Sequence, residues 1–535
     1  MAEIKRKYRD PSVPIEQRVD LLIDQMTTQE KLMQLAAVYV NDAFNNIETK
    51  TLSQGKLLGC VREGWGHFSC AVRYEYPANG VCLANSMQKA AFEETRLGIP
   101  VVIHDESLHG CMAQGSTSFP QAIGLAATWD PKLMERVASA IGRETAARGV
   151  NQALSPTINI ARDKRCGRTE ETYGEDPVLA SRMAVAFIKS MQKENVICTP
   201  KHFVANFVGD GGRDSNDIHI SERLLREIYF PAFEASIREG GALSLMSAYN
   251  TLDGAPCSAN RWLLTHVLRN EWGFKGYVVS DYGSVVHLLL KHRTAATRAL
   301  CAKKCLEAGL DIELPGNECV SALMRSIDEG ELSLETLDEN VRRVLYVKFK
   351  TGLFENPYVD ERRAVQVINC DKHRDLAREA ARRSMVLLKN DGILPLRKDL
   401  HSIAVVGANA AVYRPGGYPP RNTSGESPLD NIKSAVADAC AVEYAQGCAL
   451  RSDSHEFIPE AVEKARAADA VIVVAGNANG HGWKDAGENT EGEEHDRCRL
   501  ELPGAQEALI EAVCNVNDRV VVVLINGSAI VMTHW

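Results

Sequence analysis

Gly276-Tyr277-Val278-Val279-Ser280-Asp281-Tyr282-Gly283 gives the first indication of the architecture. Three apolar residues follow a turn glycine and precede a second glycine, a pattern that predicts a short buried strand. The strand ends on the carboxylate of Asp281. In a parallel (β/α) barrel the active site lies at the carboxyl ends of the strands, so Asp281 is a candidate catalytic residue. Taken alone, a Ser-Asp pair after a strand is more often a turn or a helix cap.

Three other apolar runs of strand length end in polar groups. Residues 100–103 lead into His104-Asp105-Glu106, residues 196–200 into Lys201-His202, and residues 242–246 into Tyr249-Asn250. Helical patterns separate these runs, as in a barrel. Because the carboxyl ends of all the strands meet at one face of a barrel, we expect these side chains to converge on one polar, acid-rich site.

Composition narrows the class of protein. The 535 residues are 45% hydrophobic and 24% charged, which predicts a globular protein of more than one domain. The net charge of -9, without a basic stripe, argues against nucleic acid or an anionic membrane as a partner. The N-terminal residues lack the apolar core of a secretory signal, and no apolar run approaches membrane-spanning length. The 15 scattered cysteines favour reduced thiols, no structural metal and a cytoplasmic location.

The pattern of elements predicts two domains. Strand and helix patterns alternate from about residue 58 to 315, a helical pattern continues to about 350, and a polar, proline-containing stretch follows. Continuous apolar runs at 402–406, 470–474 and 520–525 predict strands buried on both faces. We therefore predict a barrel domain over residues 1–350, a linker over 351–395 and an α/β domain with a mostly parallel sheet over 396–535.

Two features of the second domain allow a functional interpretation. Gly407 and the pair Gly416-Gly417 follow its first strand, but no GxGxxG motif occurs there, so we favour a structural turn and predict no cofactor. An acidic loop over residues 485–497 lies between two predicted strands. Such runs are usually solvated surface, yet this position also allows the loop to project toward the neighbouring domain.

A series of short motifs runs through the chain from about Tyr8 onward. They are residues 26–31, Glu106-Ser107-Leu108-His109-Gly110, residues 162–168, Tyr173-Gly174-Glu175-Asp176-Pro177, Lys201-His202-Phe203, Ser280-Asp281, Asp496-Arg497 and Leu502-Pro503-Gly504. In this order the motifs resemble those of glycoside hydrolase family 3. The resemblance implies a (β/α)8-like TIM barrel followed by an (α/β)6 sandwich, with the active site between them and without a metal or cofactor.

The resemblance also implies roles for individual residues. Asp281 corresponds to the nucleophile, and a retaining glycosidase pairs such a carboxylate with a protonated carboxyl about 5–5.5 Å away. Lys201 and Arg168 would keep neighbouring carboxylates ionised, although a purely structural ion pair is the alternative. The residues implied to hold the sugar are Glu106, Arg168, Lys201, His202 and Tyr249.

In this family the acid/base residue lies on a variable loop of the second domain. Glu491 matches the first glutamate of an E-x-E-x-x-D-R pattern, and Glu493 and Glu488 are the alternatives. The chain departs from the family at two positions. Glu494 replaces a common glycine, which affects the register of the loop, and Tyr282 replaces the tryptophan that often follows the nucleophile, which affects the platform for the aglycone.

The resemblance implies an exo-acting retaining β-glycosidase that hydrolyses terminal non-reducing β-D-glucosyl or β-D-xylosyl residues of oligosaccharides or of aryl and alkyl β-glycosides. Glu106 stands in a xylosidase-like form of its motif, so a β-xylosidase/α-L-arabinofuranosidase is the alternative. Lys201-His202-Phe203 does not continue as the K-H-F-P-G-H-G motif of N-acetylhexosaminidases. From other classes, a Schiff-base aldolase using Lys201 and an inactive carbohydrate-binding protein stay open.

The C-terminal segment predicts an incomplete second domain. The apolar run 520–525 is followed by a glycine turn and a further apolar run to Trp535. Buried parallel strands need helices on both faces, and members of the family continue beyond this point. We therefore expect exposed apolar surface that favours homo-oligomerisation.

Overall fold

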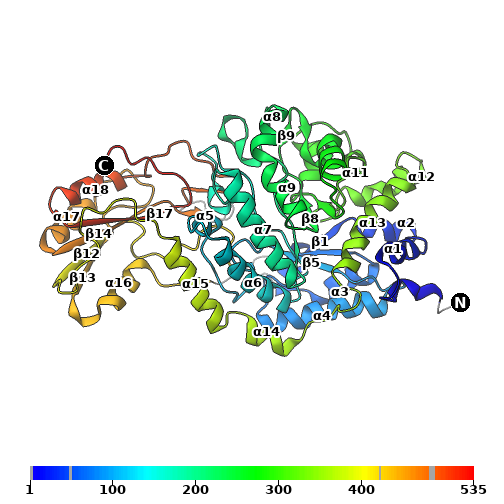
Figure 1. The fold of residues 1–535 in the computed structure, drawn as a ribbon, viewed down its shortest axis with the longest axis horizontal. Helices are drawn as coiled ribbons and strands as arrows, with labels where there is room; N and C mark the ends of the chain where they lie inside the picture. Colours follow the sequence, from blue (N-terminus) through cyan, green and yellow to red (C-terminus); the bar gives the residue numbers. More distant parts are fainter. Residues whose placement is uncertain (1–3, 47–50, 421–422, 481–488) are drawn as a thin grey trace.

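The computed structural model describes residues 4–46, 51–420, 423–480 and 489–535. It contains a barrel, coloured blue to green in Figure 1, and a separate α/β domain in yellow to red, as predicted from the sequence. No helix within these ranges has both the length and the apolar composition that crossing a bilayer requires.

The barrel is built from short parallel strands. Five of them form one sheet in the order β1-β4-β5-β6-β7, and β8 pairs with β11. Single bridges close the ring: Phe203 pairs with Ser247, and the segment 310–314 pairs with β11 through Ile312 and with Ala36 through Glu313. The strands are β1 (Ala37–Tyr39), β4 (His67–Ser69), β5 (Val102–Asp105), β6 (Gln152–Ala153), β7 (Ile197–Cys198), β8 (Ser244–Met246) and β11 (Tyr277–Val279).

Helices surround this ring and bury an apolar stripe against it. Their starts are encoded locally: Asp176 accepts hydrogen bonds from Val178 N and Leu179 N, and Pro177 occupies the first helical turn of α7. The helices are α1 (Ile15–Ile23), α2 (Thr28–Met33), α3 (Gln54–Glu63), α4 (Pro77–Glu94), α5 (Ala122–Ala126), α6 (Pro131–Ala147), α7 (Pro177–Lys193), α8 (Glu222–Leu224), α9 (Pro231–Arg238), α10 (Ser284–Leu290), α11 (Arg298–Ala308), α12 (Leu323–Asp328) and α13 (Leu334–Lys350).

A buried charge network fixes the amino-terminal ends of the last two barrel strands. Asp311, which is fully buried, accepts hydrogen bonds from Val278 N (2.7 Å), Arg269 Nη2 (2.8 Å) and Arg343 Nε (2.7 Å). Arg269 also donates to the carbonyl oxygens of Gly276 and Gly309, both at 2.9 Å. The network therefore clamps β11 at its start, and Asp281 follows its end.

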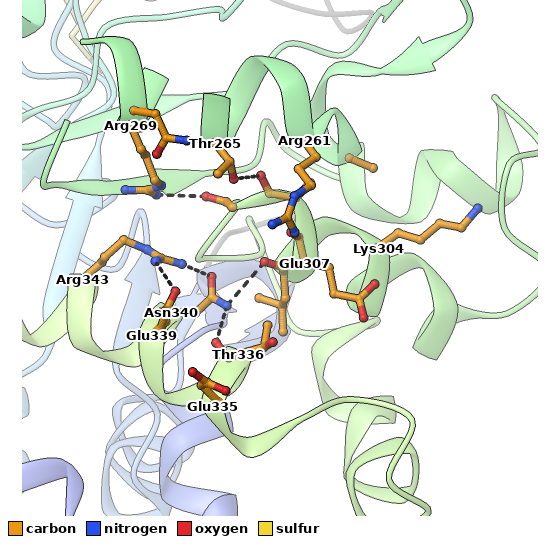
Figure 2. A pocket seen from close by; sticks show the side chains of 15 residues that line it. Arg261, Thr265, Arg269, Lys304, Glu307, Glu335, Thr336, Glu339, Asn340 and Arg343 are labelled. Atoms are coloured by element: carbon orange, nitrogen blue, oxygen red, sulfur yellow. Dashed lines mark hydrogen bonds and ion pairs between the residues drawn. The ribbon is translucent and has the colours of Figure 1, made fainter. Parts of the chain in front are cut away.

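This clamp lies beside a cavity of about 770 Å³ on the barrel face opposite the strand carboxyl ends. Figure 2 shows Arg269 and Arg343 on its walls, with Arg343 reaching toward Asn340. Arginine, lysine and glutamate side chains line it, and the hydrogen bonds drawn in Figure 2 join lining residues to one another. We therefore assign this region a structural role.

The second domain is a parallel four-stranded sheet in the order β13-β12-β14-β17. The three strands predicted from continuous apolar runs are present, but β17 is only partly buried and not covered on both faces as predicted. Strand β13 was not predicted because Ala441-Val442-Glu443-Tyr444-Ala445 is no continuous apolar run, and only Ala445 is fully buried. The strands are β12 (Ser402–Val406), β13 (Ala441–Ala445), β14 (Ala470–Gly476) and β17 (Val520–Ile525), with α16 (Pro428–Val436), α17 (Ile458–Ala467) and α18 (Gln506–Cys514) against them.

Burial in this domain is uneven. Every residue of β14 is buried, whereas β17 forms the edge of the sheet and is only partly covered, with Val523 38% exposed. Residues 385–388, Met-Val-Leu-Leu, are 62–77% exposed and have no regular secondary structure. The segment that leads into this domain thus presents contiguous apolar side chains to solvent.

Residues 351–395, predicted as a linker, contain α14 (Glu361–Val367) and α15 (Asp371–Ser384). In Figure 1 α14 lies along the bottom of the barrel, against α4 and α6, and α15 lies to the left of α6, against α5 and α6. The side chain of His373 on α15 reaches Glu144 Oε1 at 2.7 Å, and both groups are buried. This segment therefore ties the α/β domain to the barrel before the chain reaches β12.

Candidate active site

The barrel brings together the polar groups that follow its strands. Asp281 follows β11, Glu106 follows β5, Lys201 and His202 follow β7, and Tyr249 follows β8. Asp281, Glu106, Lys201 and His202 are each at most 7% exposed, and Tyr249 is half-buried. The expectation that strand ends converge is therefore met for these residues.

The two carboxylate oxygens of Asp281 differ in their surroundings. Oδ1 accepts a hydrogen bond from Tyr282 N at 2.7 Å. Oδ2 lies 3.6 Å from His202 Nε2 and has no hydrogen-bond partner within the described residues. Burial raises the pKa of Asp281 to about 6, and the charge of Glu493 adds to this, while Lys201 and Arg168 oppose it. At neutral pH the group is thus ionised, with one oxygen available to react.

Glu106 and Lys201 form a buried ion pair with a distance of 2.6 Å between Oε1 and Nζ. Burial raises the pKa of Glu106 to about 7, although Lys201 lowers it. Among the described residues no partner bonds the second oxygen, Oε2. Burying a carboxylate oxygen without a hydrogen bond costs free energy. This oxygen is therefore suited to accept a hydrogen bond from a hydroxyl group of a ligand.

His202 is held as a neutral imidazole. Asn159 Nδ2 donates to the His202 carbonyl oxygen at 3.1 Å, which orients the amide so that Asn159 Oδ1 faces His202 Nδ1 at 2.8 Å. Nδ1 therefore carries the proton and Nε2 is an acceptor. Burial, together with the charges of Arg168 and Lys201, holds the pKa of His202 well below its usual range.

Arg168 connects the barrel to the second domain. Its Nε and Nη2 bind both oxygens of Glu171, at 2.7 and 2.9 Å, and its Nη1 lies 3.2 Å from Glu493 Oε1. The guanidinium is 1% exposed. The structural ion pair considered for Arg168 is therefore present with Glu171, and the remaining donor faces the acidic loop.

The acidic loop does reach the barrel. Asp496 accepts from Gly167 N at 2.9 Å and from Asp214 N at 2.6 Å, both on barrel loops. A Cβ atom at Gly167 would lie 2.2 Å from the carbonyl oxygen of His495, so the close contact requires glycine. These contacts explain the aspartate of the Asp496-Arg497 motif as an anchor of the loop.

The two candidate glutamates in the described part of this loop have different environments. Glu491, on β16 (Glu491–Gly492), is 1% exposed and its Oε2 accepts from Ser528 Oγ (2.5 Å) and Asn477 Nδ2 (3.2 Å). Arg497 Nε approaches the same oxygen at 3.5 Å, so the partners of Glu491 all belong to the second domain. Glu493 instead faces Arg168 of the barrel. Glu488 lies outside the described residues.

Tyr418 is a site residue that the sequence analysis missed. Its hydroxyl donates to Glu493 Oε2 at 2.5 Å, and its ring lies 5.3 Å from Lys201 Nζ and 5.8 Å from Arg168 Cζ. Tyr249, which was predicted, donates to the Tyr282 carbonyl oxygen at 3.1 Å. The Gly416-Gly417 pair was the available signal for Tyr418, but a glycine turn does not indicate which side chain follows it into a site.

Comparison with known proteins accounts for both domains. Residues 27–347 match the model of the glycosyl hydrolase family 3 N-terminal domain, and residues 385–535 match that of the family 3 C-terminal domain. A β-xylosidase of Formosa agariphila is 38% identical over 83% of this chain and 64% of the relative, and thermostable β-glucosidase B of Acetivibrio thermocellus is 37% identical over 82% of this chain and 56% of the relative. The chain thus spans less than two thirds of the length of these relatives.

Solved structures give the same picture. A β-glucosidase from Erythrobacter marinus superposes with a TM-score of 0.90 at 32% identity, over 98% of this chain and 73% of that one. A β-glucosidase from Listeria innocua in complex with glucose superposes with a TM-score of 0.83 at 29% identity, over 96% of this chain and 70% of that one.

Proposed function

Since this chain belongs to glycoside hydrolase family 3, we propose that it is a retaining exo-β-glycosidase that releases terminal non-reducing β-D-glucosyl or β-D-xylosyl residues. The observation that carries the proposal is the state of Asp281, a buried carboxylate at a strand end with one oxygen uncommitted. Nearby cations and a neutral histidine acceptor complete a group of side chains suited to a polyhydroxylated ligand.

The proposed reaction is a double displacement. Asp281 Oδ2 attacks the anomeric carbon, the glycosidic bond breaks, and the acid/base residue protonates the departing oxygen. A water molecule then attacks the anomeric carbon of the glycosyl ester, the same residue takes its proton, and the carboxylate of Asp281 is released. Two inversions at one carbon give a sugar with retained configuration.

For the acid/base role we propose Glu493. Its contacts with Arg168 place it beside the barrel pocket, and its charge contributes to the raised pKa of Asp281. Glu491, the first candidate from the sequence, stays a prediction that mutagenesis tests separately. Its contacts to Ser528 and Asn477 favour a role in supporting the loop.

The sugar-binding roles of Glu106, Arg168, Lys201, His202 and Tyr249 remain part of this proposal. Glu106 Oε2 and His202 Nε2 supply acceptors for hydroxyl groups, and Lys201 supplies donors. Glucosyl and xylosyl groups differ by one hydroxymethyl group, and small differences of this kind change specificity only about 10- to 200-fold. Relatives named as β-glucosidases and as β-xylosidases both support activity on the two sugars.

The test combines a substrate panel with covalent labelling. Nitrophenyl β-glucoside and β-xyloside should be hydrolysed with retention, and a 2-deoxy-2-fluoro glycoside should label the peptide that contains Asp281. Label on another residue, an inverted product, or action only on α-glycosides or N-acetylglucosaminides would refute the proposal. Borohydride trapping of a substrate on Lys201 would indicate the aldolase, and carbohydrate affinity without turnover the binding protein.

A further inference from the structure

Residues 415–418 form a short segment of the second domain that lies against the barrel. Barrel side chains bind the main chain of this segment. Gly417 N donates to Glu170 Oε1 at 2.5 Å, and Gly417 O accepts from Gln121 Nε2 at 2.7 Å. Gln121 Nε2 also reaches Pro415 O at 3.3 Å. We call residues 415–418 the docking segment.

The docking segment has little freedom to move. Gly416 has a φ of +77°, and a Cβ atom there would lie 2.4 Å from Gln121 Nε2, so the contact requires glycine. Gln121 is itself oriented by His109, whose Nε2 lies 3.1 Å from Gln121 Nε2 and whose Nδ1 lies 2.9 Å from the Phe119 carbonyl oxygen. Because His109 and Gln121 are barrel residues, the position of the docking segment is set by the barrel.

The docking segment places Tyr418 beside Glu493, the proposed acid/base residue. Tyr418 is 8% exposed, packs against Leu108 and Met112, and directs its hydroxyl to Glu493 Oε2. The other carboxylate oxygen of Glu493 faces Arg168. Each oxygen of Glu493 is thus approached by a donor, and both donors are positioned by the barrel although Tyr418 and Glu493 belong to the second domain.

We propose that Tyr418 is a positioning residue that orients Glu493 and lowers its proton affinity. The inference rests on the proposed acid/base role of Glu493. A hydroxyl that donates to a carboxylate stabilises the ionised form and so lowers the pKa of that group. Burial, reinforced by the charge of Glu493, raises the pKa of Tyr418 well above its ordinary value, so the phenol stays protonated and remains a donor.

Such a donor serves both steps of the reaction. In the free enzyme Asp281 and Glu493 oppose each other's ionisation, and a proton held on Glu493 supplies the acid of the first step. Once Asp281 is esterified by the sugar, that charge is gone, and Tyr418 together with Arg168 favours the ionised base that accepts a proton from water. Fixed hydrogen bonds also restrict the rotamers of a loop side chain, which keeps its carboxyl within reach of the glycosidic oxygen.

Tyr418→Phe tests the hydroxyl alone. The alkaline limb of kcat/KM, which reports the protonated acid in the free enzyme, should move up by about one pH unit. Turnover of alkyl glycosides should fall roughly tenfold. For dinitrophenyl glycosides, whose leaving group needs little protonation, kcat/KM reports the first step and should change little. Tyr413→Phe removes a phenol that lies just before the docking segment and is the matched control. Its pH profile of kcat/KM should be unchanged.

Replacing Tyr418 with 3,5-difluorotyrosine gives a prediction of opposite sign. Its more acidic phenol is a stronger donor, so the alkaline limb should move to lower pH while the shape of the side chain is nearly kept. This variant also keeps the test decisive if Tyr418→Phe destabilises the fold. An alkaline limb that stays in place in both variants would overturn the inference.

Glu493→Ala separates this inference from the proposed function. If azide fails to restore its activity on activated substrates, the acid/base assignment is wrong and the role of Tyr418 falls with it. If azide does restore activity but the Tyr418 variants keep the wild-type pH profile, only the inference about Tyr418 fails. In the Tyr418→Phe/Glu493→Ala double variant, the loss should equal that of Glu493→Ala alone.

Discussion

The two halves of the candidate site are built on different principles. The barrel half consists of side chains that leave the ends of short buried strands. Within it Lys201 pairs with Glu106 and opposes the raised pKa of Asp281. In the second-domain half Glu493 stands on a loop and depends on a contact from the other domain, that with Arg168. A strand end positions a group through the backbone, whereas a loop needs external contacts to do so.

The largest effect is expected in the barrel half. Asp281→Asn removes the proposed nucleophile and should lower kcat by on the order of 10⁴- to 10⁶-fold, because no other group forms the covalent intermediate. The measurement is steady-state hydrolysis of a dinitrophenyl glycoside, after the variant has been checked for a wild-type far-UV spectrum. Residual activity within about a hundredfold of wild type would place the nucleophile elsewhere.

The second-domain half is tested by two substitutions on one loop. Glu493→Gln should lower turnover of poor leaving groups about 10²- to 10⁴-fold, the usual range for a general acid. Glu491→Gln should cost roughly tenfold or less and should instead lower the thermal midpoint, since Glu491 bonds Ser528 and Asn477 within its own domain. The reverse pattern would restore Glu491 as the acid/base.

A pH experiment tests the raised pKa of Asp281 in the barrel half. With the pKa of Asp281 near 6, kcat/KM should fall as pH drops below about 6. Because this pKa lies above the ordinary value of 3.8, ionising Asp281 costs stability in the folded protein, and the cost appears as pH rises from about 4 to 6. Asp281→Asn should therefore raise the thermal midpoint more at pH 8 than at pH 4.5. An equal change in the thermal midpoint at both pH values would mean that ionising Asp281 does not destabilise the folded protein.

The smallest effect concerns the exposed apolar segment that leads into the second domain. Residues 385–388 expose four consecutive apolar side chains, which favours self-association. Leu387→Glu should weaken concentration-dependent association in sedimentation velocity and leave turnover within about twofold of wild type. Leu290→Glu, at an exposed leucine of the barrel, is the control. Identical sedimentation of the Leu387 variant and the wild type would remove residues 385–388 as the cause of association.

The barrel half was predictable from sequence for a physical reason. An apolar run such as Val278-Val279 specifies a buried strand, and the residue after it is then placed by the fold. The choice between Glu491 and Glu493 could not be made in this way, because both are equally polar and nothing in the loop's periodicity distinguishes them. The barrel contacts Gly167 to Asp496 and Arg168 to Glu493 support the proposal of Glu493, and both join residues more than three hundred positions apart. Tyr418 was not predicted for the same reason, since its contacts with Glu493 and Lys201 join residues far apart in the sequence.

The clamp formed by Asp311 and Arg269 lies at the opposite end of the barrel from the proposed chemistry, yet it holds the strand that carries Asp281. In a random mutagenesis screen for loss of activity, substitutions at these two positions should appear among the inactive clones although neither residue touches the sugar. Their signature would be dependence on growth temperature, with colonies active in the cold and inactive when warm. Directed evolution of this scaffold toward new glycosides should therefore leave Asp311 and Arg269 unchanged and vary the loops at the other end.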